Sequence, residues 1–345
     1  MRRSAGRIFL WLVFLVILGE VGGRLYLFLA LDASPVRPNN AILHYYPELR
    51  VVAGKNIGPD DGTVDVLLLG GSVVHPTWSP VGSILSEWLT LETGREVRVH
   101  NLAGEGHTSL DSLIKYRRLA DKSFDLVVFY HGINEARANN VPPDVFDSAY
   151  EHCGWYRKVN ALDRDRWLPW LALPAAARHG SRVVLETVTG GPPVSAYLPP
   201  SAWRKYGNDV RSAETFRANL DEIATIARDR RESLLLVTFA THVPEDYSDP
   251  KFRERQLDYN RHLSPIGIWG APENVVKAVD AHNEVVRRMA VEFPEVLLID
   301  QAKLMPHGRI YFNDVCHLTV AGSEVFVANL MDTLLGVVSA EGAEP

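Results

Sequence analysis

The sequence predicts an α/β fold in which a five-stranded parallel sheet lies between two layers of helices, with a transmembrane helix at the N-terminus. Two observations lead to this prediction. Apolar runs, each about the length of one strand, alternate with amphipathic stretches along most of the 345 residues. Strands that are apolar on both faces are typical of parallel sheets covered by helices on each side. In addition, a long uncharged apolar stretch follows the first few basic residues.

The composition is that of an ordinary globular protein. Hydrophobic residues make up 46% and charged residues 23% of the chain, which excludes a wholly disordered protein. The net charge of −6 offers no basic field for nucleic acid, so no nucleic-acid partner is expected. With only Cys153 and Cys316, the chain has neither a disulfide framework nor a cysteine-rich zinc module. The sequence does not decide whether these two residues form a disulfide.

Residues 1–33 are predicted to be an uncleaved membrane anchor. Ile8–Leu31 is apolar except at Glu20 and Arg24, and as a helix it would be about 36 Å long, enough to cross a hydrocarbon core of about 30 Å. The two charged residues are four positions apart, so they can pair on one face of the helix. A cleaved signal peptide is the alternative, because the uncharged run Ile8–Gly19 has the length of a signal-peptide core.

The charges that flank this segment predict its orientation. Arg2, Arg3 and Arg7 precede it, and no matching basic cluster follows directly after it. Basic residues stay on the cytoplasmic side of a span, so the tail is expected in the cytoplasm and the rest of the chain on the periplasmic or extracytoplasmic side. Residues 34–63, which include the sequence SPVRPNN, are predicted to be a linker and lead-in.

The remaining chain, residues 64–340, is predicted to form one domain. Its expected strands are Val64–Leu69, Val97–Leu102, Asp125–Tyr130, Ser233–Phe239 and Glu295–Ile299. Its expected helices are Val81–Thr93, Ser109–Ala120, Ser212–Arg230, a segment from about 273 to Phe293, and Thr319–Leu335. Two irregular insertions, at about 141–210 and 241–273, are expected to form a cap.

The strand order decides which loops meet. In the order 2-1-3-4-5 the domain is a flavodoxin-like three-layer sandwich, and the first three strands are neighbours. The carboxyl ends of parallel strands meet at the same edge of a sheet, where ligands bind. Ser72, Gly106 and Asn134 follow these three strands, so their side chains or backbone groups are expected to converge.

Each of the three residues also has an ordinary structural interpretation. Ser72, in G-G-S-V-V, could be a helix N-cap, Gly106 could simply complete a turn, and Asn134, in H-G-I-N-E, could cap a turn. The functional interpretation is more specific. An exposed serine hydroxyl can act as a nucleophile, and a backbone N–H or a side-chain amide can donate to an oxyanion.

The segment Asp314-Val315-Cys316-His317 is the most specific of these signals. A carboxylate three residues before a histidine can accept from one ring nitrogen and leave the other to serve a hydroxyl. A metal site is less favoured, because no further ligand follows at a recognisable spacing. Cys316 is a rival nucleophile, although a buried thiol that only fills space is the commoner case.

Taken in order, Ser72, Gly106, Asn134 and the pair Asp314-x-x-His317 resemble the four blocks of the SGNH/GDSL hydrolase superfamily. The resemblance implies that Ser72 is the nucleophile. It implies an oxyanion hole made by the N–H groups of Ser72 and Gly106 and by the side chain of Asn134. His317 is then the general base, and Asp314 orients it.

The resemblance covers Val64–Leu335 and has two departures. The second block could also be aligned on Gly104, but Gly106 directly precedes H-T-S, as the glycine of the superfamily precedes its x-T-S. Gly71 stands where the superfamily has the aspartate of G-D-S, and Glu135 where it has the aspartate of G-x-N-D. Neither position is a nucleophile, base or oxyanion donor.

The function expected from this pattern is a serine ester hydrolase that needs no metal or cofactor. Its substrate is an acylated small molecule, glycan or lipid, and membrane anchoring with export favours an O-acylated envelope carbohydrate or lipid. An O-acyltransferase that uses the same site, and a non-catalytic envelope binding or scaffold protein, are the alternatives. Four further histidines near strand ends are candidates for substrate contact: His75, His107, His131 and His242.

Overall fold

The computed structural model describes residues 2–58, 62–164, 170–194 and 196–341. The chain divides into two compact units. The first, here called the helical unit, contains Met1–Arg50 and Ala149–Tyr197. The second, the sheet unit, contains Val51–Ser148 and Leu198–Pro345 and includes every predicted site residue.

The sheet unit is built on five parallel strands in the order β2-β1-β3-β4-β5. This confirms the predicted α/β class and the flavodoxin-like order. The strands are β1 (Val64–Gly70), β2 (Val97–Asn101), β3 (Leu126–Tyr130), β4 (Ser233–Val237) and β5 (Leu297–Ile299). In the register, Gly70 lies opposite Tyr130 and Leu68 opposite Asn101, so β1, β2 and β3 end close to the same level.

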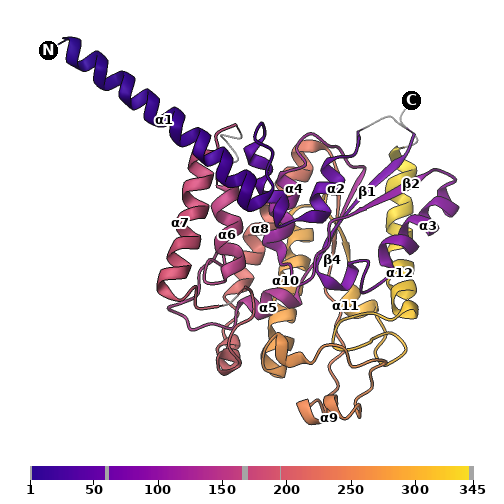
Figure 1. The fold of residues 1–345 in the computed structure, drawn as a ribbon. Helices are drawn as coiled ribbons and strands as arrows, with labels where there is room; N and C mark the ends of the chain where they lie inside the picture. The colour runs from indigo at the N-terminus through magenta and orange to yellow at the C-terminus, as the bar shows by residue number, and fades with distance from the viewer. Residues whose placement is uncertain (1, 59–61, 165–169, 195, 342–345) are drawn as a thin grey trace. The chain divides into compact units, whose positions relative to one another are not determined.

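Helices cover both faces of this sheet (Figure 1). The helix α3 packs against α12, and α8 packs against both α4 and α10. The bounds are α3 (Val81–Thr93), α4 (Ser109–Arg117), α5 (Ile133–Ala138), α8 (Ser212–Arg230), α9 (Asp249–Arg253), α10 (Pro272–Glu292), α11 (Gln301–Leu304) and α12 (Val320–Glu341). Short 3-10 helices are η2 (Ser72–Val74), η3 (Ser201–Asn208) and η4 (Ile266–Ile268).

The helical unit contains the N-terminal helix. Its elements are α1 (Arg2–Leu31), η1 (Pro38–His44), α6 (Gly154–Asp163) and α7 (Leu173–Thr189), and α2 (Pro47–Ala53) crosses the boundary between the units. Within α1, Gly6–Leu31 is long and apolar enough to span a membrane, with a mean hydropathy of 2.0. The predicted pairing of Glu20 with Arg24 is present, at 2.7 Å.

The second half of α1 packs on α7. The Glu20 carboxylate accepts hydrogen bonds from the backbone N–H groups of Ala172 and Leu173, where α7 begins. A Cβ atom at Gly23 would approach the Leu173 backbone to 3.0 Å, so glycine permits this close contact. The side chains of Ile8–Leu18, by contrast, are all exposed.

A second helix also passes the test of length and composition for a membrane span. Val320–Ser339 of α12 has a mean hydropathy of 1.3, and 39% of it is buried within the protein. Phe326, Leu330 and Leu334 have no exposed surface and belong to the core between α12, α3 and the sheet. Its apolar character is therefore that of a helix covering a sheet.

The prediction of an irregular segment at 141–210 was wrong, because this stretch contains α6, α7 and η3. Its many prolines suggested loops, but Pro174 lies in the first turn of α7, where proline is tolerated. Residues 34–63, predicted as a linker, contain η1 and α2. The segment 241–273 belongs to the sheet unit and reaches the predicted site.

Candidate active site

The candidate nucleophile lies at the carboxyl end of β1. All residues of β1 are buried, and the chain leaves the strand through Gly70 and Gly71 before Ser72 begins η2. A Cβ atom at Gly71 would come within 2.9 Å of Asn134 Nδ2 and 3.4 Å of the His107 carbonyl oxygen. Glycine at this position therefore lets the loops that follow β2 and β3 approach the serine closely.

Three of the predicted residues form one hydrogen-bonded chain. Ser72 Oγ lies 2.9 Å from His317 Nε2, and His317 Nδ1 lies 2.8 Å from Asp314 Oδ2. Ser72 is 8%, His317 2% and Asp314 0% exposed, so the chain of hydrogen bonds is nearly closed to water. With the Nδ1 proton donated to the carboxylate, Nε2 is free to accept the serine proton.

The carboxylate of Asp314 is held by backbone groups from two segments. It accepts from the N–H groups of Cys316 and His317 in its own loop, at 3.0 and 2.9 Å. It also accepts from the N–H of Ser264, at 3.0 Å, in the segment between β4 and α10. Three backbone donors fix the orientation of this buried carboxylate.

The oxyanion donors predicted from the sequence lie on neighbouring loops. Asn134 Nδ2 donates to the His107 carbonyl oxygen at 2.9 Å, which joins the start of α5 to the loop that contains Gly106. Gly106 has φ +76°, a backbone conformation that favours glycine. Within the described residues, the backbone N–H groups of Ser72 and Gly106 donate no hydrogen bond and remain available.

Buried charges from α4 and α5 hold the Gly106 loop in place. Lys115, which has no exposed surface, donates to the Leu102 carbonyl oxygen and contacts His107 Nδ1 at 3.0 Å. Arg137 donates to the Gly106 carbonyl oxygen at 2.7 Å. Burial, with a further contribution from Lys115, lowers the pKa of His107 to about 3, so its ring is neutral at pH 7.

Glu135, one of the two departures from the superfamily pattern, also lies beside the loop that contains Gly106. One oxygen of its carboxylate accepts from the Ser109 N–H at the start of α4. Its side chain is fully buried, and burial raises its pKa to about 7. The longer side chain thus links α5 to α4 behind the oxyanion loop and takes no direct part in the hydrogen-bonded chain.

Two tryptophans at the site had no signal in the sequence motifs. Trp78 stacks on the His317 ring, with centroids 4.2 Å apart, and its Nε1 donates to Glu105 at 2.7 Å. Trp269 donates from Nε1 to Asn134 Oδ1 at 3.1 Å, which fixes the orientation of that amide. Trp269 lies in the segment predicted as an insertion, and only the folded chain brings it to the site.

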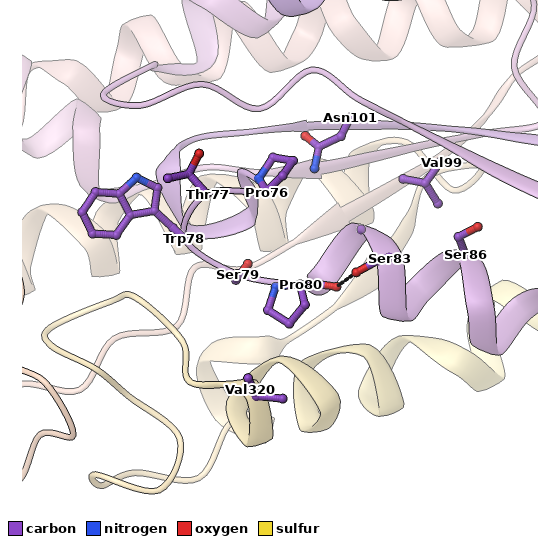
Figure 2. A pocket seen from close by; sticks show the side chains of 11 residues that line it. Pro76, Thr77, Trp78, Ser79, Pro80, Ser83, Ser86, Val99, Asn101 and Val320 are labelled. Carbon is purple, nitrogen blue, oxygen red and sulfur yellow. Dashed lines mark hydrogen bonds between the residues drawn. The ribbon is translucent and has the colours of Figure 1, made fainter.

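Two cavities open beside the site. The first, of 620 Å³, is lined by Trp78, Pro80, Ser86, Asn101, Val320 and six other residues. Figure 2 shows it between the loop after η2, the helix α3 and the first residue of α12, with Trp78 at one end. The second cavity, of 460 Å³, shares Trp78, Pro80 and Val320 with the first.

The four additional histidines have structural partners. His75 Nδ1 accepts from the Thr77 N–H, and His107 contacts Lys115. His131 Nε2 pairs with the hydroxyl of a serine in α4 at 2.7 Å. The ring of His242 stacks edge-on with Tyr259. Substrate contact by these histidines remains a prediction.

A metal ion does not fit the cluster of ligating atoms at this site. Asp314, Cys316 and His317 offer such atoms within 4.8 Å of one another. The Asp314 oxygens, however, already accept from three backbone groups and from His317. Burial and the nearby Asp314 raise the pKa of the Cys316 thiol well above its usual value, which disfavours both a thiolate ligand and a thiolate nucleophile. Cys153 and Cys316 are both free.

Comparison with solved structures finds similar folds at low sequence identity. A GDSL-like lipase from Bacteroides thetaiotaomicron is 12% identical over 84% of this chain and 97% of its own, with a TM-score of 0.47. A lipase/acylhydrolase from Enterococcus faecalis is 17% identical over 79% and 96%, with a TM-score of 0.37. A mutant of an acetyl-xylooligosaccharide esterase from Geobacillus is 12% identical over 78% and 93%, with a TM-score of 0.42.

No protein-family model and no curated protein sequence matches the chain. Two of these structures are described as a GDSL-like lipase and a lipase/acylhydrolase.

Proposed function

We propose that the chain is a serine ester hydrolase of the SGNH/GDSL type, in which Ser72 forms an acyl-enzyme. The observation that carries this proposal is the hydrogen-bonded chain Ser72–His317–Asp314, in which all three groups are buried and the two contacts measure 2.9 and 2.8 Å. A nucleophile, a base and a group that orients the base are the parts that acyl transfer requires.

The proposed reaction uses the three hydrogen-bonded side chains in turn. Ser72 Oγ attacks the ester carbonyl carbon and transfers its proton to His317 Nε2, while Asp314 stabilises the imidazolium. The carbonyl oxygen becomes an oxyanion and accepts from the N–H groups of Ser72 and Gly106 and from the Asn134 amide. The bond to the alcohol oxygen then breaks, and His317 returns the proton to that oxygen. Water, activated by the same base, releases the acyl group.

The position of the substrate is inferred from the N-terminal helix. We propose that α1 anchors the chain with Arg2, Arg3 and Arg7 in the cytoplasm and the sheet unit exported. An exported, membrane-bound esterase meets acylated carbohydrates and lipids of the envelope, so these are the proposed substrates. Protease added outside the inner membrane should digest the sheet unit and leave a tag at the N-terminus intact. Protection of the sheet unit would contradict this orientation.

A covalent probe tests the nucleophile. The full chain in detergent is treated with a fluorophosphonate, and the adduct is measured by intact mass. The wild type should gain one adduct and Ser72→Ala none. Ser112→Ala is the matched control, because Ser112 also hydrogen-bonds a histidine, and it should label like the wild type. Absence of labelling in all variants would contradict the proposal and favour a binding or scaffold role.

The acceptor of the acyl group separates hydrolysis from transfer. With an activated acetyl ester as donor, the hydrolase should release free acetate at a rate that added sugars do not change. Acetylated sugar formed in proportion to the added sugar would show instead that the chain is an O-acyltransferase. Both outcomes require Ser72, so Ser72→Ala serves as the background in each assay.

A further inference from the structure

The second cavity beside the candidate site is lined by two arginines and by no acidic residue. It measures 460 Å³, and the lining residues that matter here are Trp78, Asn260, Arg261, Arg309, Asn313 and Thr319. We call it the arginine cavity. Both arginine side chains are on the surface, and within the described part of the chain neither guanidinium forms an ion pair. No carboxylate lines the cavity, although the protein as a whole has a net charge of −6.

The acidic residues nearby form no ion pair with these arginines within the described residues. Asp258 lies against Gly308, one residue before Arg309, without pairing with that arginine. Glu105 accepts from Trp78 Nε1 and belongs to the loop after β2. Two unpaired guanidinium groups facing one cavity favour an anion, because guanidinium matches the geometry of a carboxylate or a phosphate.

The arginine cavity adjoins the base of the hydrogen-bonded chain. Asn313 and Thr319, which flank His317 in sequence, line it, and the backbone N–H of Arg261 donates to the Asn313 carbonyl oxygen at 3.1 Å. Trp78 lines the cavity and also stacks on the His317 ring. A group bound here is therefore on the side of His317, which in the proposed reaction gives its proton to the departing alcohol.

We propose that the arginine cavity binds an anionic group on the alcohol part of the ester, and that the substrate is an O-acylated acidic sugar. The inference rests on the proposed function, because the alcohol is identified by its position beside His317. The Trp78 ring suits a sugar ring, and the guanidinium groups can also donate to its hydroxyls. Asn260 and Asn313 hydrogen-bond each other, and Thr319 bonds the backbone, so these side chains shape the cavity wall. The two arginines bind the carboxylate or phosphate that the sugar carries.

Esters that differ only in the charge of the sugar test whether the arginine cavity prefers an anion. Three probes are compared on the full chain in detergent: mono-O-acetylated methyl glucoside, the corresponding uronate, and the glucoside phosphorylated on its primary hydroxyl. We expect kcat/KM for an anionic probe to exceed that for the neutral probe by about 10-fold, which is the usual scale for a charge-assisted contact. The advantage should decline with added salt, because exposed charges are screened. The uronate and phosphate arms show which anion the cavity prefers.

Removal of the two guanidinium groups tests the site itself. The variant Arg261→Gln with Arg309→Gln should lose the advantage of the anionic probes and keep the rate on the neutral probe within about 2-fold. The control is Arg228→Gln with Arg288→Gln, which has the same net charge but changes exposed arginines on α8 and α10 outside the cavity. The control should retain the preference of the wild type.

Labelling by the fluorophosphonate distinguishes a failure of this inference from a failure of the proposed function. If the wild type labels and methyl glucuronide slows labelling more than methyl glucoside does, the inference is supported, provided that the arginine variant loses the difference. If the wild type labels but neither hydrolysis nor protection depends on the charge of the sugar, the inference is wrong and the proposed function stands. If Ser72 neither labels nor hydrolyses any ester, the proposed function fails, and the inference fails with it.

Discussion

Within the described residues, the sheet unit contains three buried serine–histidine pairs, and they differ in what the second nitrogen of the histidine ring contacts. Ser72 pairs with His317 at 2.9 Å, Ser112 with His131 at 2.7 Å, and Ser212 with His282 at 3.0 Å. In distance and burial they are alike. His317 also has a carboxylate on its second ring nitrogen, from Asp314, and the described residues offer none to the other two histidines.

The surroundings of the other two histidines keep them neutral. Burial lowers the pKa of both His131 and His282 to about 3, and neither hydrogen-bonds a carboxylate within the described residues. A histidine with so low a pKa is a poor base for the proton of a serine at neutral pH. A serine–histidine contact alone is thus no sign of catalysis. The carboxylate and the neighbouring oxyanion donors distinguish the proposed active pair from the structural ones.

The largest expected effect is on the proposed active pair. Ser72→Ala and His317→Ala should each lower kcat by roughly 10³–10⁶, and the double variant should be little worse than either, because the two groups act as a unit. Steady-state kinetics on one ester substrate, with thermal melts alongside, measure this. Independent and additive losses would show that the pair does not act as nucleophile and base.

Removal of the charge of Asp314 should make His317 resemble the structural histidines. In Asp314→Asn an amide would face three backbone donors and the His317 ring, which disturbs the ring tautomer, so kcat should fall by about 10³–10⁴. The pH profile of kcat/KM gives a second readout. A variant that keeps wild-type kcat would refute the role of Asp314 in orienting the base.

The oxyanion donor should contribute less than the pair. Asn134→Ala should lower kcat by about 10²–10³, the usual loss for one preorganised donor. The structure adds a cost in stability of about 1–3 kcal/mol, because the Trp269 N–H and the His107 carbonyl oxygen lose their partner. Kinetics and chemical denaturation measure the two effects separately. Full activity would remove Asn134 from the mechanism.

Replacement of His131 should lower the stability of the protein and hardly change its catalytic rate. His131→Ala leaves the Ser112 hydroxyl unpaired and a cavity beside Phe129, so the free energy of unfolding should fall by about 2–4 kcal/mol. Ser112→Ala is the milder control. Activity per folded molecule should stay within about 5-fold. A well-folded His131→Ala protein without activity would mean that the wrong histidine has been assigned as the base.

The buried histidines should also make the protein sensitive to acid. His107, His131 and His282 have pKa values of about 3 in the folded protein, against 6.5 as the ordinary value. Between these values the unfolded chain binds more protons, so the free energy of unfolding falls as the pH falls from 6.5 towards 3. Each histidine contributes about 1.4 kcal/mol per pH unit within that window.

Glu135 acts in the opposite direction. Its pKa is raised from 4.5 to about 7, so the folded protein holds a proton that the unfolded chain has released between these values. Its contribution to stability is therefore present below pH 4.5 and lost as the pH rises through 7. Glu135→Gln should steepen the loss of stability in acid between pH 4.5 and 7 by about 1.4 kcal/mol per pH unit. Unfolding curves of both proteins over this range measure it, and equal slopes would contradict the assignment.

The fold was predictable because its elements carry local signals. Five apolar runs predicted the strands, and the order of the strands followed from the topology that such alternation favours. The stretch around α6 and α7 was predicted wrongly because its many prolines are typical of loops. Local helix signals are nevertheless present in α7, which has Pro174 in its first turn and Gly190 in the left-handed conformation at its end. The buried residues of α7 lie on a single face, and part of that face packs on α1. This contact joins residues about 150 positions apart, so no spacing along the chain reveals it.

The sequence by itself determined the parts of the site that depend on short spacing. Asp314 lies three residues before His317, so one loop supplies both, and the glycines before Ser72 form the turn that places it at the end of β1. The resemblance implied His317 as the partner of Ser72, but only the tertiary structure brings these two side chains, 245 residues apart, to 2.9 Å. The tertiary structure alone placed Trp78, Trp269 and the Ser264 N–H, because such contacts depend on how separate loops pack, and no spacing along the chain encodes that packing.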